Sequence, residues 1–178
     1  MDRMDIESSL KTFRIIVDTR EQNTPASKQR IEAMDAPIER ATLNYCDYAA
    51  NITLPDGNAL HSISGRISPA CAIERKMSLD ELAGCLTRDR ARFRREFERA
   101  RDSGSKVYLL VEDATWEGIM NHRYRSKFTP KAFLASLTAW MVRYDFKIVF
   151  CKSLTSGQMI REILYRDIKE RLENGEYG

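Results

Sequence analysis

The most constraining feature of this 178-residue sequence is an apolar strand that leads directly into a helix. Residues 70–73 carry small and branched apolar side chains, and the run then turns charged over residues 74–76. Ser78 is a favourable N-cap, and an acid three residues later completes a capping box. The apolar residues of 79–86 then recur at helical spacing. The sequence therefore predicts a buried strand with a charged end, held beside the start of a helix.

Further strands and helices alternate along the chain. Thr129-Pro130 is a cap followed by proline at the first helical position, and a long apolar face comes after it. Such alternation is typical of the α/β class, with a central, mostly parallel sheet covered by helices on both faces. The strands are predicted at residues 14–17, 70–76, 107–111 and 146–150, and the helices at 27–34, 79–86, 89–101, 130–141 and 155–172.

The chain has the length of one domain, and no repeat or Pro/Gly/Ser-rich linker divides it. We predict a flexible N-terminal arm over residues 1–12, a single domain over 13–172 and a short tail over 173–178. Asp56-Gly57 lies between runs with strand-like character and favours a β-hairpin turn. Residues 49–69 are therefore predicted to form a hairpin insertion.

Composition excludes several classes of protein. No apolar run approaches the roughly 18 residues that span a bilayer, and the first residues lack a signal-peptide stretch, so we expect a cytoplasmic protein without a membrane partner. The four cysteines form no Cys-x-x-Cys pair and the two histidines lie far apart, which argues against a zinc site or a histidine-based triad. Any catalytic chemistry must therefore come from carboxylates and lysine. The formal net charge of +3 is too small to indicate nucleic acid by itself.

The charged strand end is the first candidate for chemistry. Glu74 and Lys76 are two residues apart in a strand and therefore share one face, while Arg75 points to the other. A neighbouring strand would bring Asp47 beside Glu74. Oxygen ligands without His or Cys select Mg²⁺ or Mn²⁺. Two acids that hold such an ion can position a water for attack on a phosphodiester, with Lys76 stabilising the charge that develops.

A simpler interpretation exists for the same residues. In a chain with 31% charged residues, a Glu-Arg-Lys triplet arises readily and is often a solvated strand end. Two features favour the chemical interpretation, because the triplet follows an apolar run and the capping box fixes where the strand ends. Asp80, in the first helical turn, is by itself explained by the preference for acids near helix N-termini.

The order and spacing of these motifs resemble the XPF/Hef-type structure-specific DNA endonucleases, a branch of the PD-(D/E)XK restriction-endonuclease-like superfamily. The family signature appears here as Cys46-Asp47, the triplet at 74–76 and, after three further residues, Asp80. Residues 17–21, Val-Asp-Thr-Arg-Glu, look like the family's opening motif, and residues 107–112 look like its strand that ends in Glu. The resemblance covers about residues 14–169. It implies a restriction-endonuclease-like, three-layer α/β/α fold with a mixed, mostly parallel sheet.

The resemblance also implies roles for individual residues. Cys46 stands where the family usually has glycine. The gap from Asp47 to Glu74 is longer than the family's, which the hairpin insertion would explain, and Asp56 is a weaker substitute for Asp47. By analogy, the metal ligands are Asp47 and Glu74, the catalytic residues further include Lys76, Arg75 and Asp80, and the residues lining the site are Asp18, Arg20 and Glu21.

Basic residues are concentrated after the charged strand and its helix. Residues 88–101 hold seven arginines against three acids, a local excess of four positive charges. Such a surface can bind phosphates, although a solvated helix with i,i+4 pairs such as Arg92-Glu96 and Arg94-Glu98 is an equally good interpretation. The segment 116–128, predicted to be irregular, is basic and aromatic, and it is either a second DNA contact or an ordinary exposed loop. The DNA-binding candidates are Arg88, Arg90, Arg94, Arg123, Arg125 and Lys127.

Together these features predict a Mg²⁺- or Mn²⁺-dependent DNA endonuclease that hydrolyses phosphodiester bonds in branched DNA, such as flaps, forks or junctions, in DNA repair or recombination. The family resemblance implies a homodimer formed through the nuclease domain. A stand-alone nuclease core of this size would be expected in a phage, prophage or mobile element. Two alternatives stay open: a catalytically silent DNA-binding or scaffolding subunit of a nuclease complex, and a Holliday-junction nuclease of the PD-(D/E)XK type.

Overall fold

The computed structural model describes residues 2–177; Met1 and Gly178, the outer ends of the predicted arm and tail, lie outside this range. The strands form a seven-stranded sheet in the order β4-β2-β1-β3-β5-β6-β7. β3 pairs antiparallel with β1 and β5, and the other neighbouring strands pair in parallel. The strands are β1 (Arg14–Asp18), β2 (Ile38–Leu43), β3 (Tyr48–Asn51), β4 (Arg66–Ile67), β5 (Cys71–Lys76), β6 (Lys106–Glu112) and β7 (Lys147–Cys151).

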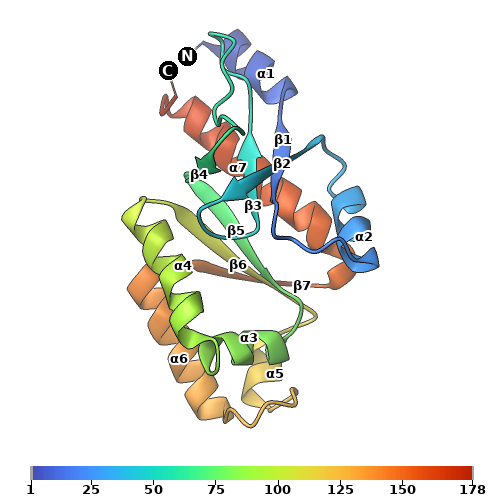
Figure 1. Ribbon diagram of the computed structural model, residues 1–178, viewed down its shortest axis with the longest axis vertical. Helices are drawn as coiled ribbons and strands as arrows, with labels where there is room; N and C mark the ends of the chain where they lie inside the picture. The colour runs from blue at the N-terminus through green and yellow to red at the C-terminus, as the bar shows by residue number, and fades with distance from the viewer. Residues whose placement is uncertain (1, 178) are drawn as a thin grey trace.

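Helices cover both faces of this sheet (Figure 1). They are α1 (Arg3–Lys11), α2 (Pro25–Ala33), α3 (Leu79–Leu86), α4 (Arg90–Asp102), α5 (Trp116–Met120), α6 (Pro130–Tyr144) and α7 (Ser156–Glu173), with a 3-10 turn at Ser153–Thr155. On one face, α1, α2 and α7 share a core with Val17, Ile73 and Leu110. On the other, α3 to α6 pack over Ala72 and Leu109. The predicted three-layer α/β/α fold with a mixed, mostly parallel sheet is confirmed.

Alternation of side chains along β5 separates the two cores. Ala72 packs under α3 to α6, whereas Ile73 packs on the side of α7. Successive side chains of a strand point to opposite faces of the sheet. Glu74 and Lys76 therefore lie on the same face as Ala72, and Arg75 lies on the same face as Ile73.

The antiparallel strand β3 brings Asp47 to the same edge of the sheet. Since β3 runs against β1 and β5, its first residue lies beside their carboxyl ends. Tyr48 pairs with Val17 of β1 on one side and with Ile73 of β5 on the other. Asp47, one residue earlier, therefore lies level with the last residue of β1 and with the charged end of β5.

Two helices form where the sequence predicts irregular chain. In place of a flexible arm, residues 3–11 form α1, which Asp2 caps and which packs Ile6 and Leu10 against the core beside α7. Two apolar residues one turn apart are too short a pattern to stand out in a sequence. Trp116–Met120 form α5 within the segment expected to be irregular. Among residues 2–177, no helix combines the length and the apolar character needed to cross a membrane.

The two ends of the predicted insertion lie in strands β3 and β4 of the sheet, and the predicted tail contacts α7. In the insertion, Thr53 and Ala59 form an isolated antiparallel bridge, and Gly57 adopts a φ of +84° in the turn between them. At the other end of the chain, Glu176 folds back to pair with Arg171 of α7.

Gly157 lets α7 approach α2 closely. A Cβ at this position would lie 2.2 Å from the carbonyl oxygen of Arg30 and 2.9 Å from the Cβ of Ala33. We expect Gly157→Ala to lower the free energy of unfolding by about 1–3 kcal/mol, because backbone atoms would have to move apart. Urea denaturation measures the loss. Gly65→Ala is the control, since no atom lies within 4 Å of a Cβ there, and an equal effect of the two substitutions would contradict this account.

Candidate active site

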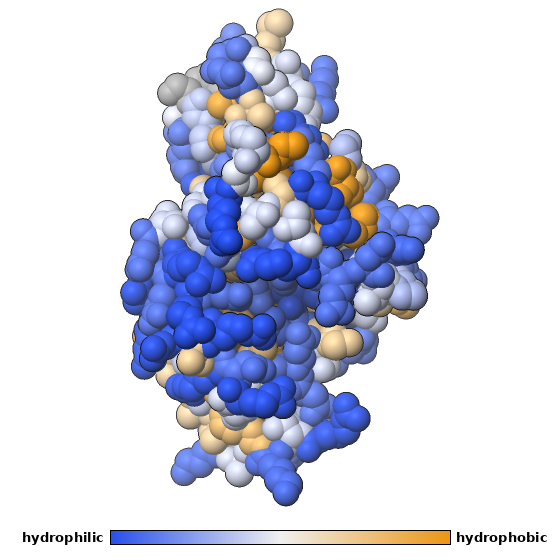
Figure 2. Space-filling view, in the orientation of Figure 1, coloured by the Kyte–Doolittle hydropathy of each residue, from blue (hydrophilic) through white to orange (hydrophobic). Residues whose placement is uncertain are grey.

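A cavity of about 190 Å³ lies between the charged ends of β1 and β5 and the side of α4. It brings together five of the predicted site residues: Asp18, Arg20, Asp47, Glu74 and Lys76. Figure 2 shows hydrophilic side chains gathered across the middle of the molecule, in the region of α4. The cavity is therefore the place in the fold where the sequence-predicted chemistry is assembled.

Three hydrogen bonds fix Asp47 in this cavity. Its N–H donates to the Ile73 carbonyl at 2.9 Å, and its own carbonyl accepts from the Asp18 N–H at 2.9 Å. Its carboxylate accepts from the Arg75 N–H at 2.8 Å. Asp47 thus connects β1 to β5 and holds its carboxylate against the strand that carries Glu74.

Cys46, which stands in place of the family's glycine, has a left-handed backbone with a φ of +61°. Its side chain is buried in the core beneath α3 and α4. A left-handed conformation costs a non-glycine residue about 1–2 kcal/mol. The turn that presents Asp47 therefore keeps the conformation that favours glycine, and the cysteine side chain is accommodated in the core at some cost in stability.

Glu74 and Lys76 form a buried ion pair. The Nζ of Lys76 donates to Glu74 and lies 5.2 Å from the centre of the Phe93 ring. Burial opposes the charged form of Lys76, but the carboxylates of Glu74 and Asp47 outweigh it and raise its pKa. Lys76 is therefore a firmly protonated cation inside the cavity.

The two carboxylates are suited to hold a divalent cation. Burial, and then the charge of Glu74, raises the pKa of Asp47 to about 8, and burial also raises the pKa of Glu74. Within residues 2–177, no three His, Cys, Asp or Glu side chains converge into a metal site by themselves. Mg²⁺ is commonly held by only one or two carboxylates, with waters and substrate phosphates as its other ligands. The oxygen donors of Asp47 and Glu74 therefore fit Mg²⁺ or Mn²⁺.

α4 adds a carboxylate, Glu96, that the sequence predicts in a solvated pair with Arg92 and not at the site. Glu96 lines the same cavity, and burial raises its pKa against the opposing charge of Lys76. Glu98, two positions further, instead forms the predicted pair with Arg94 at 3.3 Å. The available signal was helical spacing, because Glu96 lies three residues after the inward-facing Phe93.

Asp18 is occupied in holding Arg20. Its carboxylate accepts from the Arg20 backbone N–H at 2.8 Å, from the Arg20 Nε at 2.6 Å and from the Leu43 N–H at 2.7 Å. Arg20 also donates to the Leu43 carbonyl at 3.0 Å, and 53% of its side chain stays exposed. Asp18 therefore borders the cavity as a structural acid, and Arg20 is a cation fixed at its rim.

Arg75 and Glu21, both expected at the site, lie outside the cavity on the opposite face of the sheet. Arg75 donates to Glu112 at the end of β6, and Glu112 also accepts from Arg30 of α2 at 2.9 Å. Arg30 pairs with Glu21 at 3.1 Å, and the Tyr48 hydroxyl donates to Glu21 at 3.0 Å. Burial opposes the charged form of Glu112, but hydrogen bonds from Arg75 and Arg30 outweigh it and lower its pKa. We call these five residues the buried network.

The other predicted residues lie around the cavity and do not line it. Asp80 contacts the loop before α6, and Asp56, the substitute for Asp47, lies in the exposed turn of the insertion. On α4 it is Arg92 that lines the cavity, while Arg90 lies over Trp140 at 5.4 Å from its ring centre. All six DNA-binding candidates are exposed: Arg88, Arg90, Arg94, Arg123, Arg125 and Lys127.

Comparison with known proteins agrees with this architecture. The sequence matches the family model of the ERCC4 domain over residues 17–162, so the chain belongs to the ERCC4 domain family. XPF from Aeropyrum pernix has a similar structure, with a TM-score of 0.60 and 17% identity over 92% of this chain and 69% of that one. XPF from Aeropyrum pernix in complex with DNA gives a TM-score of 0.59 and 19% identity over 88% of this chain and 65% of that one. No curated protein matches the chain. The predicted resemblance to XPF-type nuclease domains is confirmed.

Two substitutions test the left-handed turn at Cys46. Cys46→Gly removes the backbone strain but also a buried side chain, and it frees the unfolded chain, so we expect a change in unfolding free energy within about 1 kcal/mol. Cys46→Val places a β-branched residue at positive φ and should destabilise by about 2 kcal/mol or more. Urea denaturation of both variants measures the difference. Equal stability of the two would contradict a left-handed conformation at this position.

The raised pKa of Asp47 predicts pH-dependent stability in the absence of metal. Between its ordinary pKa of 3.8 and about 8, the folded protein binds a proton that the unfolded chain releases, so stability falls as the pH rises. Asn has no such proton. Asp47→Asn should therefore be more stable than the wild type, with an advantage that is larger at pH 8 than at pH 5 by at least about 1 kcal/mol. Denaturation in EDTA at both pH values measures it, and a pH-independent difference would contradict the prediction.

Proposed function

We propose that the protein is a divalent-metal-dependent DNA endonuclease whose active site is the cavity at the ends of β1 and β5. One observation carries the proposal: Asp47, Glu74 and Lys76 lie in one cavity of an ERCC4 domain. A catalytically silent subunit would be favoured by loss of a carboxylate or of the lysine. Both carboxylates and the lysine are present, so the catalytic interpretation is preferred.

The cavity residues have separate roles in the proposed reaction. Asp47 and Glu74 would hold the Mg²⁺ or Mn²⁺ ion, which when bound polarises the phosphoryl group and lowers the pKa of a water. Lys76 keeps its proton and can donate from Nζ to the phosphate oxygen that gains charge. The Nε and Nη2 groups of Arg20 are held by Asp18 and the Leu43 carbonyl, and its Nη1 can donate to a phosphate oxygen.

The proposed substrate is branched DNA. The resemblance to XPF-type nucleases supports it, and one of the similar XPF structures is a complex with DNA. Exposed arginines on α4, next to the cavity wall, would supply phosphate contacts that do not depend on base sequence. A homodimer formed through the nuclease domain, and a role in DNA repair or recombination, remain predictions from the family resemblance.

A cleavage panel tests the proposal. Purified protein is incubated with labelled flap, fork, four-way-junction and linear duplex DNA in Mg²⁺ or Mn²⁺, with EDTA as the metal-free reference. We expect metal-dependent cleavage of a branched substrate, and a loss of at least about 100-fold in rate for Glu74→Gln and for Lys76→Met. Absence of cleavage, or undiminished cleavage by both variants, would contradict the proposal.

Glu96 has a matched control on its own helix. Glu96→Gln removes a charge from the cavity, and we expect it to lower the cleavage rate by about 10-fold or more. Glu98→Gln removes a charge paired with Arg94 outside the cavity and should change the rate by less than about 2-fold.

If the wild type binds branched DNA in EDTA but cleaves none of the substrates in metal, the silent subunit is the better assignment.

A further inference from the structure

The signature acid Asp80 has both carboxylate oxygens turned to a loop and away from the cavity. Its Oδ1 accepts from the backbone N–H groups of Arg125 and Ser126 at 2.8 and 3.0 Å. Its Oδ2 lies 3.5 Å from the Nε of Arg125. These partners are 45 and 46 residues away in sequence, so the contact is a tertiary one.

The preference for acids at helix N-termini does not account for this contact. Ser78 already caps α3, because its Oγ accepts from the Glu81 N–H at 3.2 Å. The Glu81 carboxylate in turn accepts from the Met77 N–H at 2.7 Å. These two hydrogen bonds serve the start of α3 without Asp80.

The contacted loop, residues 121–128, separates inward aromatics from outward cations. Tyr124 and Phe128 pack on Phe133 of α6 with ring centres 5.2 and 5.3 Å apart. The Tyr124 hydroxyl donates to the Phe128 carbonyl at 2.7 Å. The exposed residues of the loop include Arg123, which precedes Tyr124, and Arg125 and Lys127, which lie between the two aromatics. The aromatics therefore anchor the loop to α6, and Asp80 anchors it to α3.

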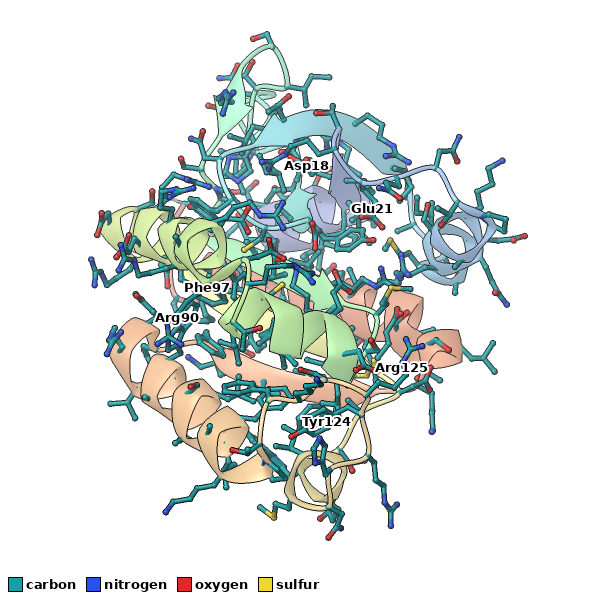
Figure 3. The ribbon with its side chains drawn as sticks, turned by 60° about the horizontal axis from the view of Figure 1, so that its bottom comes forward. Asp18, Glu21, Arg90, Phe97, Tyr124 and Arg125 are labelled. Carbon is teal, nitrogen blue, oxygen red and sulfur yellow. The ribbon has the colours of Figure 1, made fainter. Side chains whose placement is uncertain are left out.

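The outward side chains form a cationic surface. Arg125 keeps 93% of its side chain exposed even though Asp80 is near its Nε. Together with Asp80, Arg123, Arg125 and Lys127 leave two unbalanced positive charges on this surface. In Figure 3, Asp18 lies above α3 and Tyr124 and Arg125 lie below it, and none of the loop's three cations is among the residues that line the cavity. The surface is thus separate from the cavity.

We propose that Asp80 is a positioning residue that clamps the loop 121–128 as a second phosphate-binding surface for DNA. Because α3 directly follows β5, the clamp holds these cations in a fixed relation to Glu74 and Lys76. The ligand is the phosphate backbone of the DNA, whose negative charge does not depend on sequence. The assignment of DNA as the ligand rests on the proposed function, whereas the clamp does not.

Limited trypsin digestion of the full chain tests the clamp without any nuclease activity, since Arg123, Arg125 and Lys127 are trypsin sites. We expect Asp80→Ala, with a wild-type thermal melting temperature to within a few degrees, to be cut in the loop about 5-fold faster than the wild type. Glu117→Gln is the control, because it removes an exposed acid of neighbouring α5 but keeps the backbone carbonyl that accepts from the Asn121 N–H of the loop. Equal cleavage of Asp80→Ala and wild type would overturn the clamp.

Binding to labelled fork DNA in EDTA, followed by fluorescence anisotropy, tests the phosphate-binding role. Asp80→Ala should weaken binding about 5-fold in the wild type but less than about 2-fold in a background that already lacks Arg123, Arg125 and Lys127. In cleavage assays it should raise KM and leave kcat within about 2-fold.

Two outcomes would overturn this role. Unchanged affinity with a fall in kcat like that of Glu74→Gln would place Asp80 in the catalytic step. A wild type that binds no DNA would remove both the phosphate-binding role and the proposed function, while the trypsin result would still decide whether Asp80 clamps the loop.

Discussion

The geometry of the cavity follows from two backbone hydrogen bonds of Asp47. β1 and β5 are not neighbours in the sheet, and the short antiparallel strand β3 lies between them. Asp47 precedes that strand, donates to Ile73 and accepts from Asp18, so it connects the carboxyl ends of β1 and β5. Cys46, directly before Asp47, has a left-handed backbone at this junction. The site forms where the sheet changes strand direction, which is where the two carboxylates can come close.

The signature residues serve three different places in the fold. Glu74 and Lys76 face the cavity, while Arg75, between them, joins the buried network on the other side of the sheet. That network pairs two arginines with two glutamates, so removal of one partner would leave a buried charge without its counter-ion. It holds residues adjacent to Asp47 and to Glu74, since Tyr48 and Arg75 are both members. Asp80 holds a loop. The residues of one sequence signature thus have three different positions: two line the cavity, one joins the buried network, and one contacts a loop.

The sequence predicts those parts of the fold that depend on local patterns. The capping box marks the passage from β5 to α3, and the two-residue period of a strand places Glu74 and Lys76 on one face. Glu21 was placed at the site by the family resemblance, and because β1 ends at Asp18, strand alternation does not show which face of the sheet Glu21 lies on. The pairing of Arg30 with Glu112 spans 82 residues and has no local signature. Glu96 was expected in a surface pair with Arg92, because the sequence alone does not show that this side of α4 faces the ends of β1 and β5.

The central claim is that Asp47 and Glu74 together hold a divalent cation. Crystals of the wild-type protein grown in Mn²⁺ and measured at the manganese absorption edge would locate the ion by its anomalous scattering. The account predicts an anomalous peak within about 2.0–2.6 Å of oxygens of both carboxylates, on the sheet face opposite Arg75. No peak in the cavity at saturating Mn²⁺, or a peak bound by neither carboxylate, would contradict it.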